Sequence, residues 1–117
     1  MMDRLLMKGP MATFLVLLHR SGAEWDPSLP MEEQSQWPEH ASFMDQLVTE
    51  GFVVLAGPLA DDHRVVEVVE ADSEQAVRDR LALDPWSHSH LQIQSVEPWT
   101  IRLDGRRTQP KGPTSRG

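Results

Sequence analysis

The hydrophobic pattern of the first half of the chain predicts a strand followed by a helix. Residues 12–19 form a short, continuous apolar run closed by polar residues, which is typical of a buried strand. Residues 21–30 are rich in Gly, Asp, Pro and Ser and predict a loop. Residues 31–50 then repeat apolar side chains at helical spacing, and Gly51 follows as a stop signal. Because Pro38 lies within this span, we expect a break there and a new helix start with the proline in its first turn.

The pattern then predicts two strands joined by a turn. Residues 52–56 are almost entirely apolar, whereas residues 64–70 alternate between apolar and polar side chains. Gly57 and Pro58 come directly after the first of these runs, and both residue types favour turns. We therefore expect these two strands to be neighbours in the chain with a short connection between them.

A second helix and a last strand complete the pattern. Ser73 is a good helix-capping residue and begins a predicted helix over 73–82. The helix ends before Asp84, because a residue that precedes proline disfavours helical backbone. Residues 91–103 alternate again, and Pro98 marks a bulge or an edge between two strand pieces.

The order strand, helix, strand, strand, helix, strand is the split βαβ pattern of ferredoxin-like domains. We therefore predict an α+β fold, a ferredoxin-like βαββαβ unit whose two helices cover one face of an antiparallel sheet. Residues 13–18 and 53–56 are apolar on both sides, and an uncovered apolar face would be unstable in water. A second sheet would cover that face, so we predict a homodimer packed face to face.

Length and composition indicate one domain. The chain has 117 residues, of which 39% are hydrophobic and 25% charged, as is ordinary for a globular domain. We place the domain at 12–103, between a flexible N-terminal extension, 1–11, and a flexible basic tail, 104–117. The chain contains no cysteine, which excludes disulfides, a thiolate nucleophile and cysteine-ligated zinc.

The distribution of charge argues against nucleic acid as the main partner. Residues 104–117 carry four basic residues and one acidic residue, a net charge of +3, which leaves −10 for the rest of the −7 chain. An acidic body repels phosphates. No segment approaches the roughly 20 apolar residues that span a bilayer, so we expect no membrane partner. The apolar run near the N-terminus lacks a cleavage site, and we expect a cytoplasmic protein.

Candidate chemistry is concentrated in two short stretches. The predicted apolar face of the first helix contains His40. The stretch LALDPWSHSH, residues 81–90, places Asp84 and Trp86 directly after the second helix. Without cysteine, imidazoles, carboxylates and hydroxyls are the groups available for catalysis.

Three segments together resemble the YCII-related family of small, ferredoxin-like, dimeric α/β-barrel proteins. They are WPEHASFMDQLVTEGFVVLAGPL, residues 37–59, ADSEQAVRDRLALDPWSHSHL, residues 71–91, and VEPWTI, residues 96–101. The shared signals are the helix histidine, the AGP turn and the DP pair after the second helix. The resemblance covers roughly residues 12–103.

The resemblance implies a paired histidine and aspartate in a cavity beside the sheet, which correspond to His40 and Asp84 here. Two departures leave the substrate open. Relatives often have a hydroxyl residue near the AGP segment, where this chain has only Leu55 and Ala56. The loop after the first strand is also longer than usual, and its Trp25 is a candidate to line or close the cavity.

An aspartate that accepts the N–H of an imidazole fixes the tautomer and raises the basicity of the other ring nitrogen. We therefore predict a His–Asp acid/base site for lyase, isomerase or dehalogenase-type proton transfer on a small organic acid or phenol. The alternatives are a noncatalytic ligand-binding or regulatory dimer module and a purely structural domain. In those cases His40 is a packing residue with a backbone partner and Asp84 an ordinary turn residue.

The remaining candidates are weaker. His19, at the end of the first strand, and Trp86 are substrate-binding candidates together with Trp25, although tryptophans more often anchor a core. His88 and His90 have a spacing that on a strand suits a metal, but two histidines without a third ligand favour an exposed loop. The sequence contains no phosphate-binding loop or zinc signature, so neither a cofactor nor a metal is implied.

Overall fold

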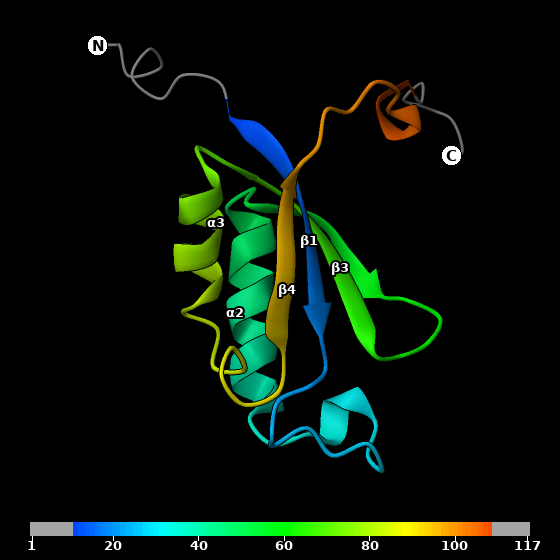
Figure 1. Ribbon diagram of the computed structural model, residues 1–117, viewed down its shortest axis with the longest axis vertical. Coiled ribbons are helices and arrows are strands. Elements are labelled where there is room, and N and C mark those ends of the chain that lie inside the picture. Colours follow the sequence, from blue (N-terminus) through cyan, green and yellow to red (C-terminus); the bar gives the residue numbers. More distant parts are fainter. Residues whose placement is uncertain (1–10, 109–117) are drawn as a thin grey trace.

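An antiparallel sheet of four strands carries two helices on one of its faces (Figure 1). This computed structural model describes residues 11–108. The strands are β1 (Ala12–His19), β2 (Val53–Pro58), β3 (Arg64–Ala71) and β4 (Gln92–Pro98). The helices are α2 (Trp37–Thr49) and α3 (Glu74–Leu81), with short 3₁₀ turns η1 (Met31–Glu33) and η2 (Gly105–Thr108).

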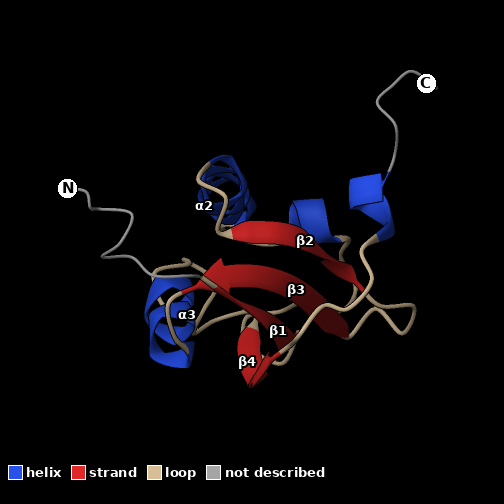
Figure 2. Ribbon diagram, turned by 90° about the horizontal axis from the view of Figure 1, so that it is seen from above, coloured by secondary structure: helices blue, strands red, loops and turns tan. Residues whose placement is uncertain are grey.

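The strand order is β2-β3-β1-β4, as Figure 2 shows from above. All three pairings are antiparallel. This is the order of a ferredoxin-like α+β fold, so the predicted fold class is confirmed. The central strand β1 pairs with β3 along its whole length, from Ala12 opposite Ala71 to His19 opposite Arg64. The predicted face-to-face dimer involves a second copy of the chain and stays a prediction.

Alternation along β1 creates the core. Phe14, Val16 and Leu18 are buried, whereas the residues between them are only partly covered. The buried positions face α2 and α3, whose Leu47, Val77 and Leu81 complete the layer between helices and sheet. Burial of apolar surface on this side, at about 25 cal/mol per Å², holds the helices against the strands.

Helix α2 begins later than the helical spacing predicts. Residues 31–33 form only the 3₁₀ turn η1, and Gln36 then adopts a left-handed backbone conformation with φ 61° before the helix starts. The expected break is therefore present but precedes Pro38, which lies in the first turn as predicted. The helical spacing of residues 31–50 predicts Val48 on the apolar face, but Val48 is 56% exposed, so that prediction is wrong.

The second helix follows its capping signal. The hydroxyl of Ser73 accepts the N–H of Ala76 at 3.0 Å and so satisfies one of the free donors of the first turn of α3. Val77 and Leu81 are buried against the sheet, as expected. The backbone then turns through Asp84, which directs the chain to β4.

The last strand is shorter than predicted. It ends at Pro98, and the expected second strand piece over 99–103 is absent. The next amide, that of Trp99, donates to the carbonyl of Thr13 at 2.9 Å. The Pro98 nitrogen therefore points away from β1, as is typical of a proline on an edge strand. The irregularity in the β1–β4 pairing lies between Leu17 and Leu18, opposite Gln94, not at Pro98.

Parts of the predicted extension, 1–11, and tail, 104–117, lie outside the described residues, so those predictions stay untested. Within the tail, Gly105–Thr108 form a short 3₁₀ helix. None of the helices in the described part of the chain is long and apolar enough to cross a membrane.

Candidate functional site

His40 and Asp84, 44 residues apart in the sequence, form a buried pair. The His40 Nδ1 atom lies 2.8 Å from Asp84 Oδ1 and 2.9 Å from Oδ2. Each residue is only 7% exposed. The contact that the family resemblance implies is therefore present, and the catalytic role of the pair stays a prediction.

Backbone contacts hold both members of the pair. His40 lies in the first turn of α2, where its amide donates to the carbonyl of Gln36. Asp84 follows α3, and its Oδ1 also accepts the backbone N–H of Trp86 at 2.9 Å. The same short turn thus fixes the carboxylate before it meets the imidazole.

Asp84, as an acceptor, places the imidazole proton on Nδ1. Nε2 of His40 is then the nitrogen that remains for a ligand, and His40 lines a cavity. This is the arrangement of an imidazole oriented by a carboxylate, in which one nitrogen is fixed and the other is available.

Trp86 separates two imidazoles in a stack. Its ring lies parallel to that of His40, with centroids 4.0 Å apart, and nearly parallel to that of His90 at 4.7 Å. The indole N–H donates to the carbonyl of Ser35 at 2.9 Å, which anchors the stack to the segment before α2. The ring therefore limits how far the His40 imidazole can tilt away from Asp84.

His90 is fully buried, which corrects the prediction that it belongs to an exposed loop. Its Nε2 lies 3.0 Å from the Ser35 hydroxyl and its Nδ1 2.7 Å from that of Ser89. Burial is the main cause that lowers the pKa of His90, which favours the neutral ring. His88, by contrast, is exposed as expected.

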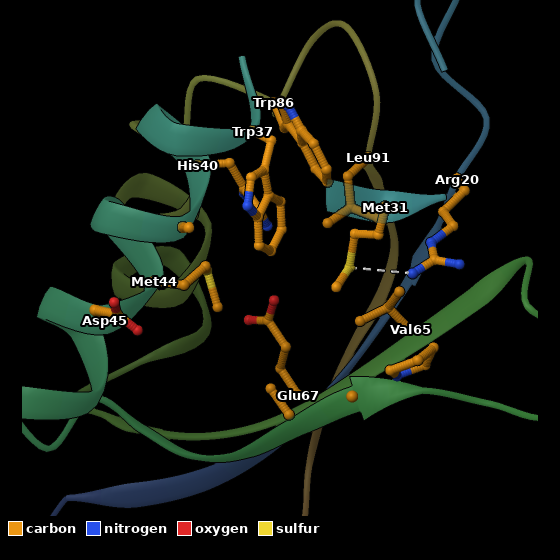
Figure 3. A pocket seen from close by; sticks show the side chains of 14 residues that line it. Arg20, Met31, Trp37, His40, Met44, Asp45, Val65, Glu67, Trp86 and Leu91 are labelled. Atoms are coloured by element: carbon orange, nitrogen blue, oxygen red, sulfur yellow. Dashed lines mark hydrogen bonds between the residues drawn. The ribbon is translucent and has the colours of Figure 1, made fainter. Parts of the chain in front are cut away.

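A cavity of about 270 Å³ lies between α2 and the strands β2 and β3, next to His40 (Figure 3). Its walls are mostly apolar and include Trp37, Met44 and Val65. Arg20 lines it too, with its guanidinium bound to Asp62. The cavity can hold a small, largely apolar molecule.

Glu67 of β3 points from the sheet into this cavity (Figure 3). It is only 2% exposed, and its Oε1 is buried without a hydrogen-bond partner. Burial, and secondarily the charge of Asp84, raises the pKa of Glu67 to about 7. A carboxyl group that is largely neutral below neutral pH therefore faces the same space as His40.

The candidate residues from the sequence did not include Glu67, although a signal exists. In the run RVVEVVEA, Glu67 occupies the same alternating face as Val65 and Val69. It lies opposite Val16 in the β1–β3 pairing, so its side chain faces the helices. An acidic residue at a core position of a strand indicates a buried ionisable group.

The other predicted site residues lie in different places. Trp86 lines the cavity, as expected for a substrate-binding candidate. Trp25 lies behind it, edge-on at 5.8 Å, and is not part of the cavity wall. His19 alternates with the core positions of β1, so it faces away from the helices and from the cavity. Neither Trp25 nor His19 therefore lines this cavity, and their predicted roles in substrate binding stay predictions.

Within residues 11–108, the His, Asp and Glu side chains form no group of three or more that could hold a metal ion. A second, smaller cavity of about 150 Å³ is lined by Glu67, Asp84 and His88, among others. Glu67 therefore lines both cavities, whereas Asp84 lines only the smaller one.

A family model described as YCII-related domain matches residues 11–100, more than three quarters of the chain. The matched range contains all four strands, both helices and the cavity residues. The searches of curated proteins and of solved structures give no significant match.

Proposed function

The chain belongs to the YCII-related family, and on that basis we propose that it uses His40 and Asp84 as an acid/base pair on a small organic molecule. The reaction class is proton transfer of the lyase, isomerase or dehalogenase type. The observation that carries this proposal is the buried contact between His40 Nδ1 and Asp84 beside a cavity lined by the same imidazole.

In the proposed reaction, His40 takes a proton from the ligand through Nε2. Asp84 holds the other proton on Nδ1 and stabilises the imidazolium that forms, while Trp86 keeps the ring in place. Return of the proton to a different ligand atom gives isomerisation, and loss of a leaving group gives elimination. General acid–base catalysis of this kind accelerates a reaction by about 10²–10⁴-fold.

The cavity walls support a small cyclic or aromatic acid or phenol as the ligand. Trp37, Met44 and Val65 offer apolar contact to a ring. Arg20, which is nearly buried, is the one cationic side chain on the described wall and provides a position for an anionic group. Its existing bond to Asp62 orients the guanidinium.

The test is exchange of carbon-bound protons for deuterium, followed by NMR, across a panel of small cyclic carbonyl compounds and phenols. We expect the wild-type protein to accelerate exchange for at least one class, and His40→Gln to lower the rate by about 10²-fold or more. Asp84→Asn preserves the shape but presents the wrong partner to Nδ1, so its rate should also fall. His63→Gln, in an exposed turn, is the matched control. Equal rates for wild type and His40→Gln would exclude the pair from the chemistry.

A noncatalytic ligand-binding or regulatory module is the alternative. The largely apolar, tryptophan-containing wall of the cavity favours it, because such a wall supports affinity without any proton transfer. Ligand binding that is equally tight in wild type and His40→Gln, with no exchange in either, would support this alternative.

A further inference from the structure

Glu67 has no role in the proposed pair, yet its position demands an explanation. Its neighbours on the same face of β3 are Val65 and Val69, and Val16 lies opposite, so the position belongs to an apolar layer. Instead a carboxyl group is buried there with one oxygen lacking a partner. Buried polar groups are almost always paired, so a buried carboxyl group that lines a cavity and has an unpaired oxygen is a candidate to hydrogen-bond a ligand.

We infer that Glu67 donates a hydrogen bond to a carbonyl oxygen of the ligand, and that the cavity therefore selects small carbonyl compounds. The inference deepens the proposed function, because it defines the ligand class of the same cavity. Glu67 lies on the cavity wall formed by the sheet, and His40 lies on the wall formed by α2.

The charged groups around Glu67 favour its neutral form. The titratable side chains that line the two cavities with it are Arg20, His40, Asp45, Arg78, Asp84 and His88. The two arginines are already bound to other carboxylates, Arg20 to Asp62 and Arg78 to Glu74. Neither forms an ion pair with Glu67, whereas the negative charge of Asp84 opposes its ionisation. A neutral carboxyl has an O–H group to donate.

The positions of the two groups suit removal of a proton beside a carbonyl group. The bond from the adjacent carbon to its hydrogen breaks, and the proton goes to Nε2 of His40. The electron pair of that bond forms a carbon–carbon double bond, and charge moves onto the carbonyl oxygen. The O–H of Glu67 stabilises that oxygen by a hydrogen bond that strengthens as the charge develops. No oxidant, reductant or cofactor enters this step.

The ligand preference is tested with two probes that differ by one oxygen atom. Oxocyclohexanecarboxylate, with its ketone opposite the carboxylate, is compared with cyclohexanecarboxylate by calorimetry. At about pH 6 we expect the wild-type protein to bind the keto acid roughly 3–10-fold more tightly, the usual range for one neutral hydrogen bond. The preference should disappear above about pH 8, because Glu67 then loses its proton. Protonation of His40 acts on both carboxylates alike and cancels in the ratio.

Two substitutions test whether Glu67 is the hydrogen-bond donor. Glu67→Gln keeps an N–H donor, so it should keep a preference for the keto acid that no longer depends on pH. Glu67→Met has a similar shape without a donor, so the two probes should bind equally at both pH values. A wild-type ratio near one, absence of binding by both probes, or an unchanged ratio in Glu67→Met would each overturn the inference.

A second measurement does not depend on any ligand. Carbon-detected NMR titration of the side-chain carboxyl groups, with the Glu67 signal identified by its loss in Glu67→Gln, should show a titration near neutral pH. A Glu67 signal that titrates like that of an ordinary surface glutamate would overturn the inference. The proposed function is tested separately. If His40→Gln leaves deuterium exchange unchanged while wild type still prefers the keto acid, Glu67 is supported as the hydrogen-bond donor and the His40–Asp84 acid/base pair is contradicted.

Discussion

At the scale of single residues, the site depends on two carboxyl groups in opposite states. Asp84 accepts hydrogen bonds from His40 and from the Trp86 amide, which suits the ionised form. Glu67 has no such donors and is deeply buried, which suits the neutral form. Two acidic residues with different environments can therefore divide the roles of acceptor and donor within one site.

The buried Glu67 also predicts a pH dependence of stability. Its pKa is raised from 4.5 in the unfolded chain to about 7 in the folded protein. As pH rises from about 4.5 to 7, the unfolded state releases the proton first, so the folded state loses stability across that window. We expect Glu67→Gln to be more stable than wild type at about pH 8, by on the order of 2–3 kcal/mol, and to show no gain near pH 4.

Urea unfolding at both pH values measures this difference. Glu97→Gln, an exposed glutamate on β4, is the control and should change little. If Glu67→Gln is no more stable than wild type at the higher pH, the folded protein holds the ionised carboxylate without loss of stability, which contradicts the prediction.

The sequence predicted this site only in part. The contact between His40 and Asp84 came from the family resemblance, because their spacing of 44 residues contains no information about distance in space. Glu67 was missed because the alternating pattern was used to predict a strand but not to assign its residues to the two faces of the sheet. The burial of His90 depends on how a distant loop packs, and a polar stretch such as SHSH does not indicate that.

At the scale of elements, the loop after β1 supports the turn that presents Asp84. Gly22 packs against the backbone of residues 89 and 90, and the amide of Glu24 donates to the carbonyl of Ser89 at 2.8 Å. Trp25 from the same loop contacts Trp86 edge-on. The longer loop noticed in the sequence therefore covers the outer side of the aromatic stack.

Gly22→Ala should disrupt this contact. An added Cβ would lie 2.2 Å from the carbonyl oxygen of Ser89, which is backbone and cannot rotate away. The two segments must separate, and we expect a loss of about 2–4 kcal/mol in unfolding free energy together with a weaker near-ultraviolet circular dichroism signal from the tryptophans. Gly105→Ala, whose Cβ would meet open space, is the matched control. If Gly22→Ala is as stable as this control, the close approach is not required.

The elements themselves were largely predictable, with boundary errors that have physical causes. Helical spacing extends back to residue 31, but the extended Gln34 and the left-handed Gln36 interrupt the helix before α2. Alternation continues beyond Pro98, but the pairing of β4 with β1 ends at Pro98, opposite Phe14. Patterns of side chains indicate which face is apolar, whereas backbone hydrogen bonds decide where an element stops.

At the scale of the whole molecule, the sheet face opposite the helices bears on the predicted homodimer. Leu15 and Leu17 of β1 and Val66 of β3 are only partly covered on that face, and Leu55 of β2 is 51% exposed. The segment after β4 borders this face at one end, near Thr13. The remaining apolar area supports the proposal that a second sheet packs there.

Sedimentation tests the dimer. We expect wild type to sediment at twice 13.3 kDa at micromolar concentration, and Leu55→Glu to weaken self-association by at least tenfold because it buries a charge between the sheets. Leu83→Glu, at a 70% exposed position after α3, should leave the association unchanged. A wild-type monomer would contradict the prediction.

The stacking of Trp86 against His40 has an optical consequence. A protonated imidazole in contact with an indole ring quenches the fluorescence of the indole more strongly than a neutral one. The centroids of the two rings are only 4.0 Å apart, so the fluorescence of Trp86 should decrease when His40 is protonated. The His90 stack is present in both wild type and His40→Gln, so a pH-dependent difference between their emission reports the contact between Trp86 and His40 before any substrate is known.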